Sequence, residues 1–151
     1  EDAGVKTAFT LSDPNMVKFF KDGLLEMIGG GVDLLFANEA EALGLAGGDD
    51  LNGAIEALKP LAREFVITRG PEGALIYSGG EIIEVAGVKT DAVDTVGAGD
   101  MFAGAFLYGY THHWDYAKAG KLAATAAARL VSQYGPRMSN EQVQDVLHQC
   151  L

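Results

Sequence analysis

Apolar and polar residues follow two periods along the chain, and together they predict alternating strands and helices. Residues 6–11 alternate as a half-buried strand does, and residues 34–37 and 65–68 are short apolar runs typical of buried parallel strands. Between the first two strands, apolar residues recur at helical spacing after a helix-start signal, with Asp13 as N-cap and Pro14 in the first turn. The side chains expected on the buried face of this helix are Val17, Phe20, Leu24 and Met27.

The rest of the chain predicts one more strand–helix unit, a hairpin and a run of helices. Asp49 or Asp50 caps a helix that reaches Leu58, and Ser78-Gly79-Gly80 separates two short strands. The later helices are expected over residues 98–110, 116–133 and 140–147. This order predicts a three-layer α/β/α fold with a largely parallel sheet, formed by residues 1–151 without an interdomain linker. In such folds, ligands bind at the carboxyl ends of the strands.

Charge and cysteine content narrow the range of partners. The chain carries 21 Asp and Glu against 11 Lys and Arg, a net charge of -10, which argues against nucleic acid or an anionic membrane as a partner. Cys150 is the one cysteine, so no intrachain disulfide can form, and a reducing cytoplasm is expected. No apolar run in the sequence reaches the length of a membrane-spanning helix.

The most informative segment is residues 94–104, DTVGAGDMFAG. A turn of small residues leads directly into a helix, so the backbone N–H groups of Gly97, Ala98, Gly99 and Asp100 are expected to form an anion site at the positive end of the helix dipole. A Cβ at Gly97 or Gly99 would hold a phosphate away from these groups. Asp100 could accept a proton from a nearby hydroxyl, although an acidic residue in the first turn of a helix is also common for structural reasons.

This segment resembles the second signature of the ribokinase-like carbohydrate kinases, the PfkB family, through D-T-x-G-A-G-D and through Phe102, Gly104 and Ala105. The resemblance implies an ATP-dependent phosphotransferase in which Asp100 is the general base and residues 97–100 hold the transferring phosphoryl group. The segments LLFANEAEAL, AGDMFAGAFLYG and SQYGPR are most similar to bacterial adenosine kinase-like members. A nucleoside is therefore the first choice of substrate, and a free or phosphorylated sugar is the second.

Two further motifs resemble parts of the nucleotide site of this family. Asn38 and Glu41 match its N-x-x-E motif, which implies that Asn38 lies near the phosphates of ATP and that Glu41 orders Mg²⁺ through water. The same pair is also a capping box, and we expect it to serve both purposes. The spacing T-x-G-x-x-G at residues 68–73 resembles the turn that borders the nucleotide, which implies that Thr68, Gly70 and Gly73 line the ATP site.

Residues 132–139 are similar to the loop that closes the adenine pocket in this family. In members activated by potassium, this loop and the aspartate that opens the signature form the cation site. The resemblance thus implies that Asp94 contributes to a K⁺ site. The weaker candidates are Ser139 and the backbone groups of Val96, Leu130, Gln133 and Gly135. Ala124 occupies a helix position where many sugar kinases have Asn, so a polar contact to adenine from that helix is not expected.

The resemblance covers only the carboxy-terminal half of the family. It implies that the half with the substrate-binding motif and the lid is absent, so that the chain alone is inactive and self-associates or forms a homodimer through the exposed surface. Two other classes stay open. A Rossmann-type oxidoreductase would need a third glycine where Phe102 stands. A non-catalytic nucleotide-binding module would have no use for Asp100.

Overall fold

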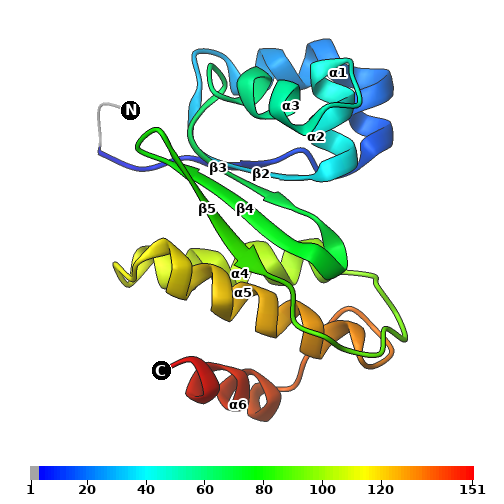
Figure 1. Cartoon of the computed structure of the whole chain (residues 1–151), viewed down its shortest axis with the longest axis vertical. Coiled ribbons are helices and arrows are strands. Elements are labelled where there is room, and N and C mark those ends of the chain that lie inside the picture. Colours follow the sequence, from blue (N-terminus) through cyan, green and yellow to red (C-terminus); the bar gives the residue numbers. More distant parts are fainter. Residues whose placement is uncertain (1–3) are drawn as a thin grey trace. The chain divides into compact units, whose positions relative to one another are not determined.

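Strands and helices alternate along the first half of the chain, as the sequence pattern predicts, and helices dominate the second half (Figure 1). The computed structural model describes residues 4–151. Its elements are, in chain order, β1 (Ala8–Thr10), α1 (Pro14–Ile28), β2 (Val32–Asn38), α2 (Glu39–Ala46), α3 (Leu51–Leu58), β3 (Ala62–Thr68), the 3-10 turn η1 (Gly70–Glu72), β4 (Gly73–Ser78), β5 (Glu81–Ala86), α4 (Ala98–Thr111), α5 (Tyr116–Val131) and α6 (Asn140–Cys150). Within this described range, no helix is both long and apolar enough to cross a membrane.

The strands form one sheet in the order β1-β2-β3-β4-β5. β1 pairs with β2, and β2 with β3, in parallel, as expected from the almost continuous apolar runs at their centres. The register of the second pair places Asn38 directly beside Thr68, at the carboxyl ends of the two strands. The predicted α/β fold with a largely parallel sheet is therefore confirmed. Two of the predicted nucleotide-site residues lie side by side at the carboxyl ends of neighbouring strands.

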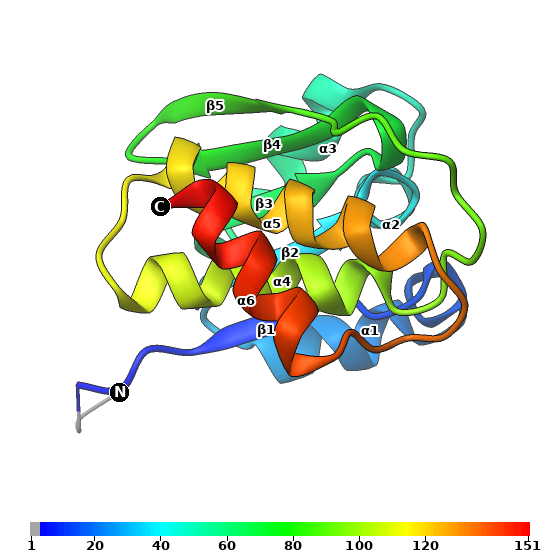
Figure 2. The same cartoon turned by 90° about the horizontal axis from the view of Figure 1, so that it is seen from below.

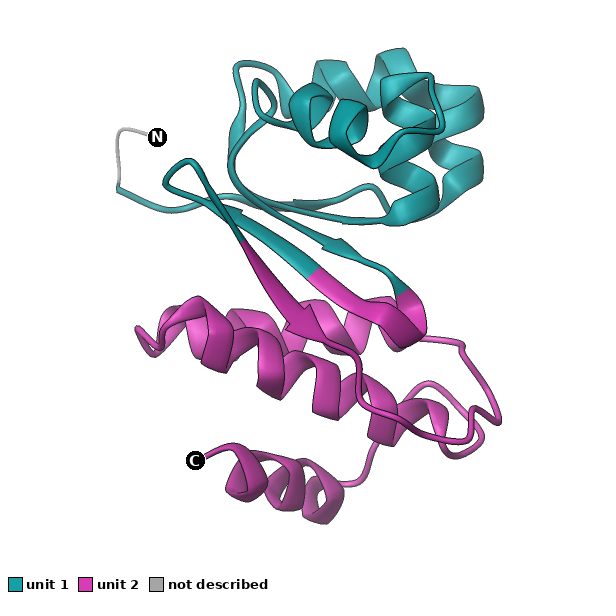
Figure 3. Ribbon diagram, in the orientation of Figure 1, with its two compact units in different colours: residues 1–69, 75–82 teal, residues 70–74, 83–151 magenta. Residues whose placement is uncertain are grey.

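The chain divides into two compact units, and each is described by itself (Figure 3). The first comprises residues up to 69 together with residues 75–82, and the second comprises residues 70–74 and 83–151. In the first unit, the inward side chains of β2 and β3 pack with those of α1, α2 and α3 into one apolar core. Leu35, Phe65 and Ile67 lie at its centre with at most 1% of their surface exposed, so these strands are held mainly by apolar burial.

Helix α1 buries a different face from the one that its spacing predicts. Val17 and Leu24 are buried as expected, but Phe20 and Met27 are 60% and 71% exposed, and Ile28 is buried instead. Phe20 has non-helical backbone angles, φ -131° and ψ 26°, so the helix is kinked there. The prediction for Phe20 was wrong because the kink turns this residue off the buried face, and the prediction for Met27 was wrong because Ile28 fills the core at that turn instead.

The helices of the second unit pack closely through small side chains. Gly109 of α4 lies against Ala119 of α5, where an added Cβ would stand only 2.7 Å from the alanine Cβ. Helix α6 packs on α5 through a small cluster that includes Leu122, Ala126 and Val146, and Figure 2 shows α6 running obliquely to α4 and α5. The alanine-rich buried face of α5 thus allows a close approach of helix to helix.

Two glycines of the second unit lie where β4 begins and where β5 ends. A Cβ on Gly73 would overlap the carbonyl oxygen of Val85, and a Cβ on Gly87 would overlap that of Pro71. Gly73 also has a φ of +97°, which L side chains rarely adopt. The glycine at position 73 is therefore required by the fold, whether or not a nucleotide contacts it.

Replacing Gly73 with Ala should destabilise the chain by about 2–4 kcal/mol, because the strain of a left-handed backbone adds to an overlap with backbone that cannot move aside. Urea unfolding of the purified chain measures this free energy. Gly79→Ala is the matched control, since Gly79 also has a positive φ of +59° but has open space around its Cβ position, so only the strain of about 1 kcal/mol is expected. Equal losses for the two variants would contradict the steric argument.

Candidate functional site

The predicted anion loop opens α4, and its N-terminus differs from those of the other helices. The other described α-helices begin at a side-chain cap, formed by Asp13, Asn38, Asp50, Asp115 and Ser139. Helix α4 begins instead at Gly97, in the left-handed conformation, without a side-chain cap. The first backbone N–H groups of α4 are therefore not taken up by a capping side chain.

Two of these N–H groups are open. The N–H of Ala98 donates to the carbonyl oxygen of Thr95 at 3.2 Å, and that of Met101 donates to Gly97 at 2.9 Å. Within residues 4–151, no group accepts a hydrogen bond from the N–H of Gly99 or Asp100. Of the four amides predicted to hold an anion, the one of Ala98 is thus already engaged in the turn. Those of Gly97, Gly99 and Asp100 have no acceptor within residues 4–151 and can bind a ligand.

Gly97 and Gly99 are glycines for different reasons. Gly97 has a φ of +81°, and an added Cβ would lie 3.0 Å from the Cβ of Pro136, so the fold itself requires a glycine there. Gly99 lies in the first turn of α4 outside the positive-φ region, and no described atom lies within 4 Å of the position of an added Cβ. The fold does not require a glycine at position 99, whereas close approach of an anion to the backbone does.

Asp100 is the third residue of α4, and its side chain is exposed. Asp100 is one of the residues that line an apolar cavity of about 460 Å³ formed by α4, α5, α6 and the loop before α6. Since Asp100 lies in the first turn of α4, its carboxylate and its unbonded backbone N–H belong to the same turn. A group held by the backbone at this turn would have an acceptor for a proton close by.

Asp94 connects the anion loop to the loop that follows α5. Its Oδ1 accepts a hydrogen bond from the N–H of Val96 at 3.0 Å, and its Oδ2 accepts one from the N–H of Gly135 at 3.0 Å. The hydrogen bonds from Val96 and Gly135 hold the pKa of Asp94 below its usual range. The N–H groups of Val93 and Asp94 donate in turn to the carbonyl of Val131. The two loops are thus joined by side-chain and backbone hydrogen bonds.

Ser139, the other predicted cation ligand, is the N-cap of α6. Its Oγ accepts from the N–H of Gln142 at 3.2 Å, and the Oε1 of Gln142 accepts from the N–H of Ser139 at 2.8 Å, which completes a capping box. Both Asp94 and Ser139 therefore have structural roles that require no cation. In the described part of the chain, no three His, Cys, Asp or Glu side chains gather as they would around a metal ion.

In the first unit, Asn38 and Glu41 form the expected capping box at the start of α2. The Oδ1 of Asn38 accepts from the N–H of Glu41 at 2.8 Å, and the carboxylate of Glu41 accepts from the N–H and the Nδ2 of Asn38 at 2.9 and 3.0 Å. Glu41 is only 4% exposed, and burial raises its pKa. A buried carboxylate of this kind is more easily kept charged beside a cation, which fits a role near Mg²⁺.

Thr68 ends β3 beside Asn38, and two charged residues follow this pair. Glu39 and Arg69 come directly after Asn38 and Thr68, and the Nε of Arg69 donates to the Oε2 of Glu39 at 2.9 Å. The sequence pattern did not single out this ion pair, although its members follow the ends of two adjacent parallel strands. In the second unit, Gly70 opens η1 with a φ of +55°, so it makes the turn that leads to Gly73.

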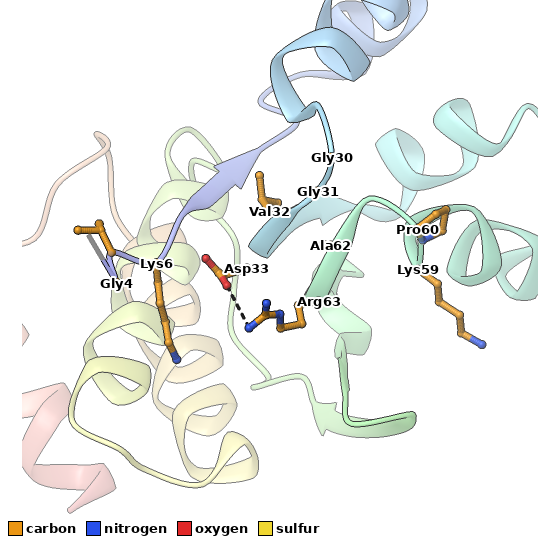
Figure 4. A pocket seen from close by; sticks show the side chains of 11 residues that line it. Gly4, Lys6, Gly30, Gly31, Val32, Asp33, Lys59, Pro60, Ala62 and Arg63 are labelled. Atoms are coloured by element: carbon orange, nitrogen blue, oxygen red, sulfur yellow. Dashed lines mark ion pairs between the residues drawn. The ribbon is translucent and has the colours of Figure 1, made fainter. Parts of the chain in front are cut away.

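A second cavity of about 630 Å³ lies at the opposite, amino ends of the first strands (Figure 4). Its side chains include Lys6, Asp33 and Arg63, and Asp33 makes an ion pair with Arg63 at 3.7 Å. Asp33 also accepts from the N–H of Thr7 at 2.8 Å, and this hydrogen bond is the main cause of its lowered pKa. Because ligands of parallel sheets bind at the carboxyl ends of the strands, we do not assign this cavity to the candidate site.

Comparison with known proteins connects this geometry to a family. The model of the pfkB family of carbohydrate kinases matches residues 2–143. The cytidine kinase of Thermococcus kodakarensis is 35% identical over 115 residues, which is 74% of this chain and 41% of that protein. The adenosine kinase of Dictyostelium discoideum is 30% identical over 141 residues, which is 84% of this chain and 41% of that protein.

A solved structure agrees with the fold over almost the whole chain. The adenosine kinase of Sinorhizobium meliloti superposes with a TM-score of 0.91 at 35% identity, covering 98% of this chain and 46% of that one. The chain therefore spans less than half the length of each of these three relatives. The fold class predicted from the sequence is confirmed by this superposition.

Replacing Asp94 with Asn should destabilise the chain, because the amide can accept from only one of the two N–H groups. Since the pKa of Asp94 is lowered by folding, its charge stabilises the folded chain above the unfolded pKa of about 3.9, and this stabilisation is lost as the pH falls through the lower folded pKa. The difference in urea midpoint between the wild type and Asp94→Asn should be full near pH 6 and shrink below about pH 4.

The control for this measurement is Asp91→Asn, which removes an exposed carboxylate three residues earlier. It should leave the midpoint almost unchanged at both ends of the pH range. A loss of stability in Asp94→Asn that is equally large at pH 3 and pH 6 would contradict a role for the charged carboxylate.

Proposed function

Because the chain belongs to the pfkB family of carbohydrate kinases, we propose that it forms the nucleotide-binding, carboxy-terminal part of an enzyme that transfers the γ-phosphate of ATP to a primary hydroxyl of a small molecule. The observation that carries the proposal is the first turn of α4. There, open N–H groups, free space above Gly99 and the exposed carboxylate of Asp100 lie together. An anion held by the backbone beside a proton acceptor is what phosphoryl transfer to an alcohol needs.

In the proposed reaction, the carboxylate of Asp100 accepts the proton of the substrate hydroxyl as the hydroxyl oxygen attacks the γ-phosphorus. The bond between the γ-phosphorus and the bridging oxygen breaks, and ADP leaves with the electron pair. The N–H groups of Gly97, Gly99 and Asp100 donate to the oxygens of the phosphoryl group. These donors are fixed by the helix start, so they need no reorganisation during the reaction.

The residues that we propose for nucleotide binding lie in the first unit and around η1. Asn38 and Thr68 lie side by side at the carboxyl ends of β2 and β3, and Gly70 and Gly73 bound the turn that follows β3. We assign these four residues to the border of the nucleotide. The buried Glu41 would hold Mg²⁺ through water, and the ion, when bound, neutralises charge on the phosphates.

A nucleoside is the substrate class that we favour, and a sugar is the alternative. The relatives include an adenosine kinase and a cytidine kinase, each matched over more than two thirds of this chain, and also a ribokinase matched over a smaller part. All of them phosphorylate small molecules by name. The proposal for K⁺ beside Asp94 and Ser139 stays a prediction, since hydrogen bonds within the chain already explain both side chains.

Of the two other classes, the oxidoreductase loses support, and turnover decides about the non-catalytic module. In a Rossmann-type oxidoreductase the glycine-rich turn follows the first strand, whereas here it opens α4 after β5. A non-catalytic nucleotide-binding module would bind ATP without turnover. Turnover by the wild type that is lost in Asp100→Asn would therefore separate a kinase from such a module.

Asp100→Asn should lower turnover by about 10²–10⁴-fold, the range for loss of a positioned general base. Folding and the affinity for ATP should be nearly unchanged, because the amide has the shape of the carboxylate and removes a negative charge next to an anion site. The measurement compares kcat, the dissociation constant for ATP and the melting temperature, in the protein at the full length of its relatives.

Two further variants make this comparison specific. Asp145→Asn removes an exposed carboxylate of α6 and should behave as the wild type. Gly99→Val keeps the base but fills the space above the open N–H groups, so it should weaken ATP binding and turnover together. If folded Asp100→Asn keeps near-normal turnover, Asp100 is not the base.

A further inference from the structure

Two glutamine side chains form a hydrogen-bonded pair between α6 and the loop before it. The Nε2 of Gln142 donates to the Oε1 of Gln133 at 2.7 Å, in a partly buried position. The Nε2 of Gln133 then donates to the carbonyl oxygen of Arg137 at 3.0 Å. Together these two bonds close the loop of residues 132–139 across its base.

This loop bears directly on the anion site. Its Gly135 donates to the carboxylate of Asp94, and its Pro136 lies where a Cβ on Gly97 would meet it at 3.0 Å. The loop has no helix or strand of its own, and Tyr134 at its tip is 85% exposed. Met138 packs on the cluster of Leu122, Ala126 and Val146, but the exposed part of the loop around Tyr134 depends on hydrogen bonds to keep one conformation.

Gln142 has a second role besides capping α6, and this role needs the amide of a glutamine. A capping box needs only an acceptor at this position, and Glu serves that purpose as well as Gln does. The acceptor of Gln142, Oε1, is the atom that caps Ser139, whereas its donor, Nε2, is used only for Gln133. The amide is thus required for the loop, because a carboxylate could cap α6 but could not donate to Gln133.

We infer that Gln133 and Gln142 are positioning residues of the candidate site, which hold the loop of residues 132–139 so that Asp94 and Gly97 keep the anion loop in its binding conformation. They touch no reacting group and act through Gly135 and Pro136. The catalytic part of this inference rests on the proposed phosphotransfer, whereas the structural part does not.

The test is Gln142→Glu, which keeps the capping box and removes only the donor to Gln133. A negative charge in the first turn also favours α6, so the melting temperature should stay the same or rise. Amide hydrogen exchange measured by NMR on the chain should nevertheless become about 3- to 10-fold faster at the N–H groups of Gly135 and Val96, as expected for the loss of one supporting hydrogen bond. Gln149→Glu, at an exposed position of the same helix, is the matched control and should change neither rate.

A rescue variant separates a positioning role from general damage. In Gln133→Lys combined with Gln142→Glu, the ammonium group can donate both to the new carboxylate and to the carbonyl of Arg137, so slow exchange at Gly135 should return. Gln133→Met removes both amide bonds and leaves the capping box intact, and it should reproduce the faster exchange. In the protein at the full length of its relatives, Gln142→Glu should lower kcat/KM for ATP by a similar factor, and the rescue variant should restore it.

Wild-type exchange rates at Gly135 and Val96 in both Gln142→Glu and Gln133→Met would overturn the inference, whatever the enzymatic rates are. Faster exchange with an unchanged kcat/KM would overturn the catalytic part of it. A wild-type protein that transfers no phosphate would contradict the proposed function alone, since the exchange rates still decide whether the glutamine pair holds the loop.

Discussion

The carboxylate of Asp94 accepts hydrogen bonds from the backbone N–H groups of Val96 and of Gly135, which lies 41 positions from Asp94 along the chain, and the anion loop depends on both of them. The bond from Val96 shapes the turn that precedes α4, and the bond from Gly135 fixes the neighbouring loop against that turn. Gly97 is then confined by Pro136 and adopts a positive φ, so α4 begins without a side-chain cap. The open N–H groups of Gly99 and Asp100 follow from this arrangement.

Open backbone donors suit a chain with a net charge of -10 that is proposed to bind a polyanion. Long-range attraction cannot bring ATP to such a protein, so binding has to come from short-range donors held in place and from Mg²⁺. Neutral N–H groups can hold the phosphates without placing a cationic side chain at the turn that carries Asp100.

The sequence predicted the parts of this account that depend on local pattern. The glycine-rich turn before α4, the caps at Asp13, Asn38 and Asp50 and the parallel strands follow from residues that are close together in the chain. The kink at Phe20 was not predictable from spacing, because it depends on how each half of α1 packs. Nor could spacing join Asp94 to Gly135 or Gln133 to Gln142, since such bonds exist only once the loops are folded against each other. Ser139 and Gln142 match a capping-box pattern, but that pattern does not reveal the second use of the glutamine amide.

The backbone of the α4 N-terminus is proposed to hold the phosphates of ATP. A titration of the ¹⁵N-labelled chain with Mg-ATP, followed by NMR, observes the N–H groups themselves. If these groups hold the phosphates, the resonances of Gly97, Gly99 and Asp100 should move the most and should saturate together. Saturable binding that leaves these three resonances in place, and instead moves those around the cavity of Lys6 and Arg63, would contradict this proposal.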